Sequence, residues 1–542
     1  MSVTPVYAGE AGASAAGAGR EPAACWSSLA ALVAIIVAAI VLRVTCFGGY
    51  QGHDDRNYIA YAYSYATRGT VPLDDATTWL GRIGFWVPLS LGLKFFGVTE
   101  ANLAVYPMLC SIGSLIVTYL LARMMFDGRI ALIATALLAV FPLDVIFSTC
   151  AYADLPVSFY TGAMLLFFVR AERGNAWYDW LGVGLTAGIA YLHKETSLAF
   201  AVPLGLYVIL RGLWRPGLAL VVLGAVLVFC GEAGFWSMTS GDPLQRFHLA
   251  SEHQARFPAS GTVKSTSWIP RPAKVHRYDN YFIEPLLMFS TEQEFGLFYW
   301  FAWPAVLFLW KRGDESTRLW RIILVVLGGM LCYFPFNFPH VTLGRDPRHY
   351  TLLSIPAVIV LASMVRYMKR SHFVAALAAL VVTSLVCIGI DGSRATMANE
   401  RQLLTWKEQH TGTRLWVDPL VGVNLFIVSD FRNDEQIGVL ESAEMANSHT
   451  VANLKVLRPD LKVASTLEEA VGGVIVTRDG SERRDKDTEP LVEAGWKPLE
   501  KVTVVRASSA LLMKVFPQWA KFIKRLTPSA GAGLQLWEQS AD

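Results

Sequence analysis

The chain has 542 residues, of which 53% are hydrophobic and 17% are charged, and its net charge is +3 at pH 7. This composition excludes an ordinary soluble globular protein and indicates a polytopic membrane protein. So small a net charge says little about partners, and we expect no nucleic acid among them. None of the seven cysteines belongs to a close-spaced pair, so we expect neither a disulfide framework nor a zinc site of the CxxC type.

The first elements along the chain are a tail and a membrane span. Residues 1–26 are rich in Ala and Gly and are predicted to form a disordered cytoplasmic tail. The apolar run that follows, 28–47, has neither a strongly basic start nor a convincing cleavage site, so we expect a retained span and not a removed signal peptide. Later apolar runs bring the total to about eleven transmembrane helices; they cover residues 101–123, 129–147, 154–170, 180–193, 195–211, 217–237, 294–310, 319–338, 351–367 and 372–390.

Basic residues set the expected orientation in the cell inner membrane. With a cytoplasmic amino terminus, every short inner connection carries Lys or Arg, as the positive-inside rule requires. The loops 48–100 and 238–293 and everything after residue 390 then lie outside. The run 84–97 is too short and too interrupted for a confident span, and we expect a helix lying on or dipping into the outer surface. A true crossing there would reverse the sides of everything downstream.

The tail 391–542 differs from the transmembrane domain 27–390 that precedes it, because it is dense in charge. Strand-like pieces at 472–480 and 501–507 alternate with helical pieces around 398–409 and 487–495, which predicts a small extracytoplasmic α/β domain. The fold class is therefore a mostly α-helical membrane protein with a C-terminal soluble α/β domain. The basic, apolar stretch 517–526 either lies on the membrane surface or packs on its own domain.

Two adjacent acids follow the first span. Asp54 and Asp55 lie at the expected membrane surface, where an ionised carboxylate is costly unless another group uses or neutralises it. Tyr58, Tyr61 and Tyr65 come next at helical spacing, which predicts an amphipathic helix in the headgroup layer. We interpret this stretch as a reaction centre. The alternatives are a solvated loop for the acids and ordinary packing for the tyrosines.

Other ionisable residues fall at or near the outer ends of the predicted spans. Their placement on one face favours an enzyme that takes a lipid-linked substrate from the outer leaflet over a secondary transporter or lipid flippase, which keeps such groups near mid-membrane. A non-catalytic envelope assembly protein is a further alternative. Singly, each has an ordinary explanation as a helix cap, a turn ion pair or an interfacial anchor; the residues are Asp154, Lys194, Glu195, Glu232, Glu294 and Arg348, the last followed by His349 and Tyr350.

Several short motifs follow one another along the chain in the order that is typical of a known family. The acidic pair with its tyrosine-rich helix, LKFFGVTEAN, YADLP, LHKETS, TSGDPL and RHYTLLSIP together resemble the C-type glycosyltransferases that use polyprenyl-phosphate sugars. Within that superfamily the chain is similar to the bacterial aminoarabinose transferases acting on lipid A and to the protein O-mannosyltransferases. The resemblance implies sugar transfer on the extracytoplasmic side, from an isoprenoid phosphate, with inversion of the anomeric configuration.

The resemblance also implies residue roles. The family's catalytic acid falls on Asp54, with Asp55 in the place of the usual Glu neighbour; its second acidic motif falls on Asp154, and its lysine after the fifth span falls on Lys194. The DDRNY sequence lacks the arginine that immediately precedes tyrosine in the aminoarabinose pattern, so lipid A does not carry over as the acceptor. The expected partners are a polyprenyl-phosphate-linked sugar donor, an envelope glycan, lipid or protein acceptor, and membrane lipid.

The residue chemistry is compatible with such a transfer. Asp54 is the candidate general base for the attacking hydroxyl or amine, and the like charge of Asp55 is expected to raise the proton affinity of the pair. Lys194 and Arg348 are candidates to stabilise the leaving phosphate. We predict that Tyr58, His349 and Tyr350 bind substrate. If Mg²⁺ or Mn²⁺ is used, the acids open to it are Asp54, Asp55 and Asp154.

The outer loop 238–293 is rich in basic residues, among them Arg246, His248 and His253. This composition fits a surface that holds phosphate headgroups or an anionic acceptor. An ordinary solvated loop is an equal alternative, because long loops cross the membrane regardless of charge.

Overall fold

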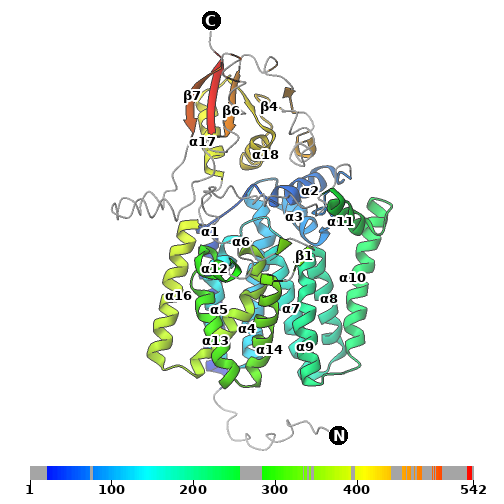
Figure 1. Cartoon of the computed structure of the whole chain (residues 1–542), viewed down its shortest axis with the longest axis vertical. Helices are drawn as coiled ribbons and strands as arrows, with labels where there is room; N and C mark the ends of the chain where they lie inside the picture. Colours follow the sequence, from blue (N-terminus) through cyan, green and yellow to red (C-terminus); the bar gives the residue numbers. More distant parts are fainter. Residues whose placement is uncertain are drawn as a thin grey trace, which may run out of the picture.

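The computed structural model describes residues 21–73, 77–256, 284–333, 335–337, 341–342, 347–391 and 397–440, together with shorter pieces of the segment 455–539 that include its strands. A bundle of long helices carries a small mixed α/β region at one end, and the last described strand lies in that region (Figure 1). We call this end of the bundle, uppermost in Figure 1, the upper end, and residues 397–539 the C-terminal region.

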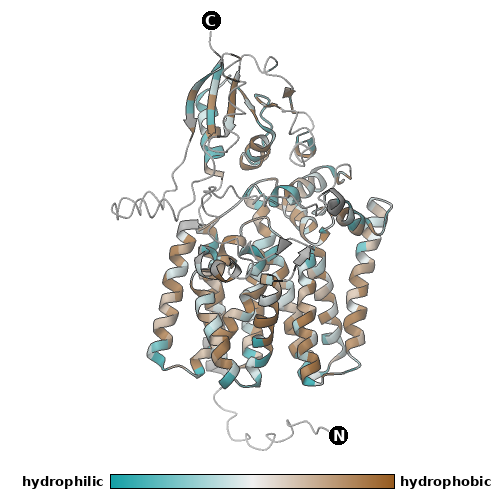
Figure 2. Cartoon of the chain, in the orientation of Figure 1, coloured by the Kyte–Doolittle hydropathy of each residue, from teal (hydrophilic) through white to brown (hydrophobic). Residues whose placement is uncertain are grey.

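Each predicted apolar run overlaps at least one helix, and the run 319–338 also covers the short strand β1 (Pro335–Asn337). Six helices among the described residues are long and apolar enough to cross a membrane, which makes this a multi-pass membrane protein; the higher number of about eleven stays a prediction. Side chains along α10 and α16 are largely apolar between more polar ends (Figure 2). The bundle helices are α1 (Glu21–Thr45), α4 (Val105–Met125), α5 (Gly128–Ala139), α6 (Pro142–Phe147), α7 (Asp154–Gly174), α8 (Trp177–His193), α9 (Ala201–Arg211), α10 (Leu218–Thr239), α13 (Phe298–Arg312), α14 (Glu315–Tyr333), α15 (Ser354–Ser363) and α16 (Arg370–Asp391).

Shorter helices cap the upper end. They are α2 (Asp55–Arg68), α3 (Ile83–Phe96), α11 (Gln245–Arg256) and α12 (Glu284–Thr291). The structure forms a helix in the ambiguous run 84–97, but at 14 residues this helix is only about 21 Å long, shorter than the hydrocarbon core of a bilayer. It lies beside α2 at the upper end (Figure 1), as expected for a helix that does not cross.

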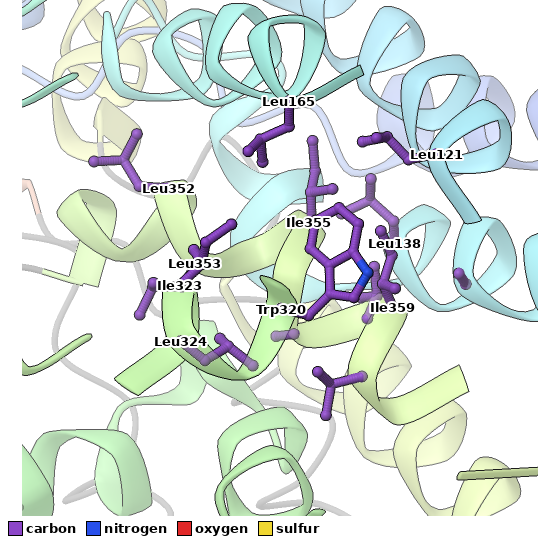
Figure 3. Close-up of a cluster of buried hydrophobic side chains, with 14 of the residues drawn as sticks. Leu121, Leu138, Leu165, Trp320, Ile323, Leu324, Leu352, Leu353, Ile355 and Ile359 are labelled. Carbon is purple, nitrogen blue, oxygen red and sulfur yellow. The ribbon is translucent and has the colours of Figure 1, made fainter. Parts of the chain in front are cut away.

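Large apolar side chains from five helices fill the centre of the bundle. Trp320 of α14 is fully buried and lies among Leu121, Leu138 and Leu165 from α4, α5 and α7, with Ile355 from α15 beside them (Figure 3). Burying such side chains removes a large apolar area from the solvent. Because the helices approach one another through this core, their ends are held in fixed relative positions at the upper end.

A buried ion pair links the first span, α1, to α6. The guanidinium of Arg43 in α1 lies 2.5 Å from the carboxylate of Asp144 in α6, with 0% and 1% of the two side chains exposed. Arg43 also donates to the Ser111 hydroxyl and to the Ala139 carbonyl. The sequence analysis did not anticipate this pair, which explains how a charged residue is tolerated inside an apolar run.

The C-terminal region contains a six-stranded sheet in the order β5-β4-β3-β6-β8-β7. The strands β3 to β6 run parallel and the last two run antiparallel to their neighbours. Asp418 caps α18 through the amides of Leu420 and Val421, with Pro419 in the first turn. The elements are α17 (Ala398–Gln409), β3 (Arg414–Val417), α18 (Pro419–Val428), β4 (Ile437–Leu440), β5 (Val463–Ala464), β6 (Gly473–Arg478), β7 (Trp496–Val502) and β8 (Leu534–Gln539).

Of the strands and helices predicted for this region, some are observed and others lie outside the described residues. The helix expected at 398–409 is α17, and the strand expected at 472–480 contains β6. The strand expected at 501–507 overlaps only the last two residues of β7 within the described part. The helix expected around 487–495 and the stretch 517–526 lie mostly or wholly outside the described residues.

Candidate active site

Residues from four separate segments meet at the upper end of the bundle. Asp54 lies in the loop before α2, Asp154 is the first residue of α7, and Lys194 follows α8 directly. Arg348 and His349 come from η5, the 3₁₀ helix Pro347–Leu353 that leads into α15. Each residue lies where a helix begins or ends, so the packing of the bundle fixes its position.

Asp54 forms an ion pair with Arg348. Its carboxylate lies 2.8 Å from the guanidinium, and 32% of the Asp54 side chain is exposed. The Arg348 guanidinium also lies over the ring of Tyr152, 4.9 Å from the ring centroid. Burial alone would raise the pKa of Asp54, but the charges of Arg348, Lys194 and Arg82 outweigh it and hold the pKa below its ordinary value.

Asp154, Lys194 and His349 form a second, more buried group next to the first. The Lys194 ammonium donates to the Asp154 carboxylate at 2.5 Å. The Nδ1 atom of His349 lies 3.0 Å from the Lys194 nitrogen and 3.2 Å from the same carboxylate. The Thr351 hydroxyl donates to the backbone carbonyl of Asp154. Since His349 follows Arg348 in the chain, the two groups form one charged site with both signs of charge.

Asp55 has a different environment from Asp54. Its side chain is completely buried, and its carboxylate accepts backbone N–H groups of Gln51 (2.6 Å), His53 (2.7 Å) and Arg56 (3.0 Å). Burial raises its pKa against the lowering effect of these donors. The like charge of Asp55 was expected to raise the proton affinity of the pair. Instead, burial raises the pKa of Asp55, which is turned onto its own loop, while neighbouring cations hold the pKa of Asp54 low.

Tyr58 is linked to a chain of ion pairs that the sequence analysis did not foresee. Its buried hydroxyl accepts a hydrogen bond from Arg82 at 2.5 Å. Arg82 pairs with Glu195 at 3.1 Å, Glu195 pairs with Arg246 of α11 at 2.7 Å, and Arg246 pairs with Glu232 at 3.1 Å. Part of the basic outer loop is thus neutralised by acids from α10 and the α8–α9 connection. The segment 257–283 of that loop lies outside the described residues.

Tyr350 lies away from the charged site. None of its surface is exposed, and its ring packs edge-on against Phe289 and Phe295. Tyr299 donates a hydrogen bond to its backbone carbonyl. The phenol therefore belongs to the apolar core, and its burial speaks against the substrate contact predicted from the sequence.

The three acids offered to a divalent cation do not form one ligand set. Asp54 pairs with Arg348, Asp154 pairs with Lys194, and Asp55 accepts backbone N–H groups. Within the described ranges, no group of three or more His, Cys, Asp or Glu side chains has the arrangement of a metal site.

Comparison with known proteins supports the resemblance. The family model described as dolichyl-phosphate-mannose-protein mannosyltransferase matches residues 83–233. Two curated relatives, both undecaprenyl phosphate-alpha-4-amino-4-deoxy-L-arabinose arabinosyl transferases from Pseudomonas aeruginosa strains UCBPP-PA14 and LESB58, are 28% identical over 320 and 312 residues. Each alignment covers 54% of this chain and 51% of the relative, so the chain spans about half the length of the curated relatives it matches.

Solved structures share the fold over more of the chain. ArnT from Cupriavidus metallidurans in the apo state covers 95% of this chain and 98% of its own, with a TM-score of 0.54 and 14% identity. The same protein bound to undecaprenyl phosphate gives a TM-score of 0.53 at 13% identity, covering 93% of this chain and 97% of its own. The Archaeoglobus fulgidus oligosaccharyltransferase in the apo form gives 0.50 at 13% identity, covering 88% and 73%. In sequence and in fold the chain is therefore similar to C-type glycosyltransferases that use polyprenyl-phosphate sugars.

Proposed function

We propose that this chain is an integral membrane glycosyltransferase that moves a sugar from a polyprenyl-phosphate donor to an envelope acceptor on the extracytoplasmic face, with inversion of the anomeric configuration. One observation carries the proposal: Asp54 lies within electrostatic reach of two cations, Arg348 and Lys194, that come from distant segments. The donor class is supported by the relatives, one of which has been solved with undecaprenyl phosphate bound.

Asp54 is the general base in this proposal. The hydroxyl or amine of the acceptor attacks the anomeric carbon while Asp54 accepts its proton. The bond between the anomeric carbon and the phosphate oxygen breaks, and its electron pair leaves with the polyprenyl phosphate. Attack from the face opposite the leaving phosphate inverts the configuration. The partial exposure of the Asp54 side chain leaves room for an acceptor to approach it.

Lys194 and Arg348 stabilise the phosphate as it leaves. A phosphate monoester anion needs charge stabilisation more than protonation, and fixed cations provide it at no cost of reorganisation during the reaction. Asp154 and His349 contact the Lys194 ammonium, so we assign Asp154 the role of positioning this lysine. An ammonium and a guanidinium each carry several N–H donors of the kind that bind phosphate oxygens.

In this proposal Arg348 pairs with two anions, first with Asp54 and then with the donor phosphate. Before the donor binds it pairs with Asp54 at 2.8 Å, and the donor phosphate then offers a second negative partner. Sharing the guanidinium between them weakens its hold on Asp54. The proton affinity of Asp54 therefore rises at the stage when a base is needed.

Three other predicted site residues receive supporting roles. Asp55 fixes the backbone that presents Asp54, through the three N–H groups that it accepts. Tyr58 orients Arg82, whose positive charge also acts on Asp54. Tyr350, a buried residue of η5, packs its ring against Phe289 and anchors η5 to the apolar core.

The upper end of the bundle faces the extracytoplasmic side in this proposal. The connections between α9 and α10 and between α13 and α14 lie at the opposite end (Figure 1). Arg215 lies in the first connection, and Lys311 and Arg312 lie in the last turn of α13, next to the second. Short connections rich in Lys and Arg stay on the cytoplasmic side. The site and the C-terminal region are then outside, where polyprenyl-linked sugars and envelope acceptors meet.

Binding of undecaprenyl phosphate to the purified full-length protein tests the proposal. Lys194→Ala removes one charged donor, so we expect the dissociation constant to rise by about 10- to 100-fold, the range for a hydrogen bond to a charged group. Lys94→Ala, which removes an exposed lysine of α3, is the matched control and should bind as the wild type does. Equal affinity of Lys194→Ala and the wild type would contradict the assignment of the phosphate site.

A further inference from the structure

The loop that carries Asp54 lies between the bundle and the C-terminal region. We call residues 46–54 the Asp54 loop. Its buried Tyr50 donates a hydroxyl hydrogen bond to the side-chain oxygen of Asn424 in α18 at 2.9 Å. The amide of Asn424 donates in turn to Glu400 of α17 at 2.9 Å. The C-terminal region therefore reaches the loop directly through side chains of two of its helices.

Glu100 ties the same loop to α17 a second time. Its buried carboxylate receives Arg401 of α17 at 2.7 and 2.6 Å and the backbone N–H of Tyr50 at 3.0 Å. Its own backbone N–H donates to Asp430 at 2.9 Å. Glu100 therefore joins the loop, the start of the second long span and the C-terminal region at one point.

Two glycines of the loop have backbone conformations that favour glycine, and both lie close to neighbouring side chains. Gly49 has a φ of +66°, and a Cβ atom there would lie 2.5 Å from the Glu100 carboxylate. Gly52 has a φ of +80°, and a Cβ atom there would lie 2.4 Å from the Met397 side chain. Only glycine adopts these conformations readily at so close an approach. The loop is therefore shaped to fit against Glu100 and the start of α17.

The turn at Asp430 and Phe431 in the C-terminal region also contacts Glu100. Asp430 and Phe431 both have positive φ, +57° and +58°, which is unfavourable for a bulky side chain such as Phe. The Phe431 ring stacks on Tyr63 of α2 with 5.1 Å between centroids and 7° between planes. Contacts with Glu100 and with α2 therefore accompany a strained turn on the other side of the interface.

The constraint extends along the backbone to Asp54 itself. Gln51 and His53, on either side of Gly52, donate their N–H groups to Asp55. Tyr50, held by Glu100 and Asn424, directly precedes Gln51. Each residue from Tyr50 to His53 is thus fixed by a hydrogen bond or by close packing.

We propose that the C-terminal region positions the general base, and that Glu100, Arg401, Tyr50 and Asn424 are its positioning residues. The proposal rests on the function assigned to Asp54 above. The Glu100–Arg401 ion pair and the Tyr50–Asn424 hydrogen bond hold the Asp54 loop in the conformation that presents the carboxylate to the acceptor. We call these two contacts the clamp. Lys194 and Asp154 belong to the bundle and pair with each other, so the clamp affects placement of the base and leaves phosphate binding intact.

Hydrogen exchange of the full-length protein in nanodiscs tests the clamp without requiring turnover. Arg401→Met should speed exchange in peptides that cover residues 46–56 by about tenfold or more, because local opening becomes easier. Lys407→Met is the matched control: Lys407 lies on the same helix but pairs with Asp434 inside the C-terminal region. This control should leave exchange in 46–56 unchanged, and Arg401→Lys should restore most of the protection.

Two further measurements separate positioning from binding. With an undecaprenyl-phosphate sugar as donor, Arg401→Met should lower kcat by about 10- to 100-fold, the cost of misplacing a reacting group by about 1 Å, with the donor KM and the affinity for undecaprenyl phosphate unchanged. Unaltered exchange in 46–56, or a loss confined to donor affinity, would overturn the clamp. Absence of transfer by the wild type would overturn the proposed function, while the exchange data would still decide the clamp.

Discussion

Two ion pairs in this molecule have similar chemistry and different surroundings. Arg43 and Asp144 join α1 to α6 with almost no exposed surface, and the arginine has further partners in Ser111 and Ala139. The pair between Asp54 and Arg348 is also short, but Asp54 remains about one-third exposed. The first pair is closed on all sides, which suits a structural link. The second pair is partly exposed, as the role that we propose for Asp54 requires.

The comparison predicts different consequences when each pair is broken. Arg43→Met leaves the Asp144 carboxylate buried and unpaired, and should lower the free energy of unfolding by about 3–5 kcal/mol. Denaturation of the purified protein measures this, while activity per folded molecule should be retained. The double variant Arg43→Met with Asp144→Leu removes both charges, so most of the lost stability should return. Continued instability of the double variant would show that the pair does more than neutralise itself.

The corresponding change at the open pair should act on pH dependence. Arg348→Met removes the largest influence that lowers the pKa of Asp54, so this pKa should rise. The base must be ionised, and activity is lost as the pH falls through its pKa. The acid limb of the kcat/KM profile should therefore move to higher pH in the variant.

Arg366→Met is the control for that shift, because Arg366 pairs with Asp314 far along the chain from the site. Its acid limb should coincide with that of the wild type. An identical acid limb in Arg348→Met would mean that Asp54 is not the titrating base, or that Arg348 does not act on it.

Four of the site residues predicted from the sequence lie close together in the fold, and there is a physical reason why the sequence singles them out. Ionisable residues at the ends of apolar runs are costly and rare, so Asp54, Asp154, Lys194 and Arg348 stand out, and the fold brings them together. The spans are equally visible, because each is a long apolar run on a helix. The small helix α17 follows from an apolar pattern between charged residues.

Other features depend on geometry that a pattern of residues does not contain. The partner of Arg43 lies 101 positions away in the chain, and no periodicity links the two. Asp55 differs from Asp54 only by the direction of its side chain, one residue further along a turn. Tyr350 likewise follows His349 on a 3₁₀ helix, where successive side chains point to different sides, and it enters the core. Arg82 lies in a loop and gives no signal until its partners are known.

The most direct test of the account is the rate of sugar transfer by Asp54→Asn, measured with undecaprenyl phosphate affinity on the same preparation. The amide keeps the size of the side chain and removes the proton acceptor, so we predict transfer at least about 100-fold slower by a protein that still inserts, folds and binds undecaprenyl phosphate. Asp242→Asn, at an exposed acid paired with His248, should transfer at the wild-type rate. Wild-type turnover by Asp54→Asn would contradict the assignment of this carboxylate as the base.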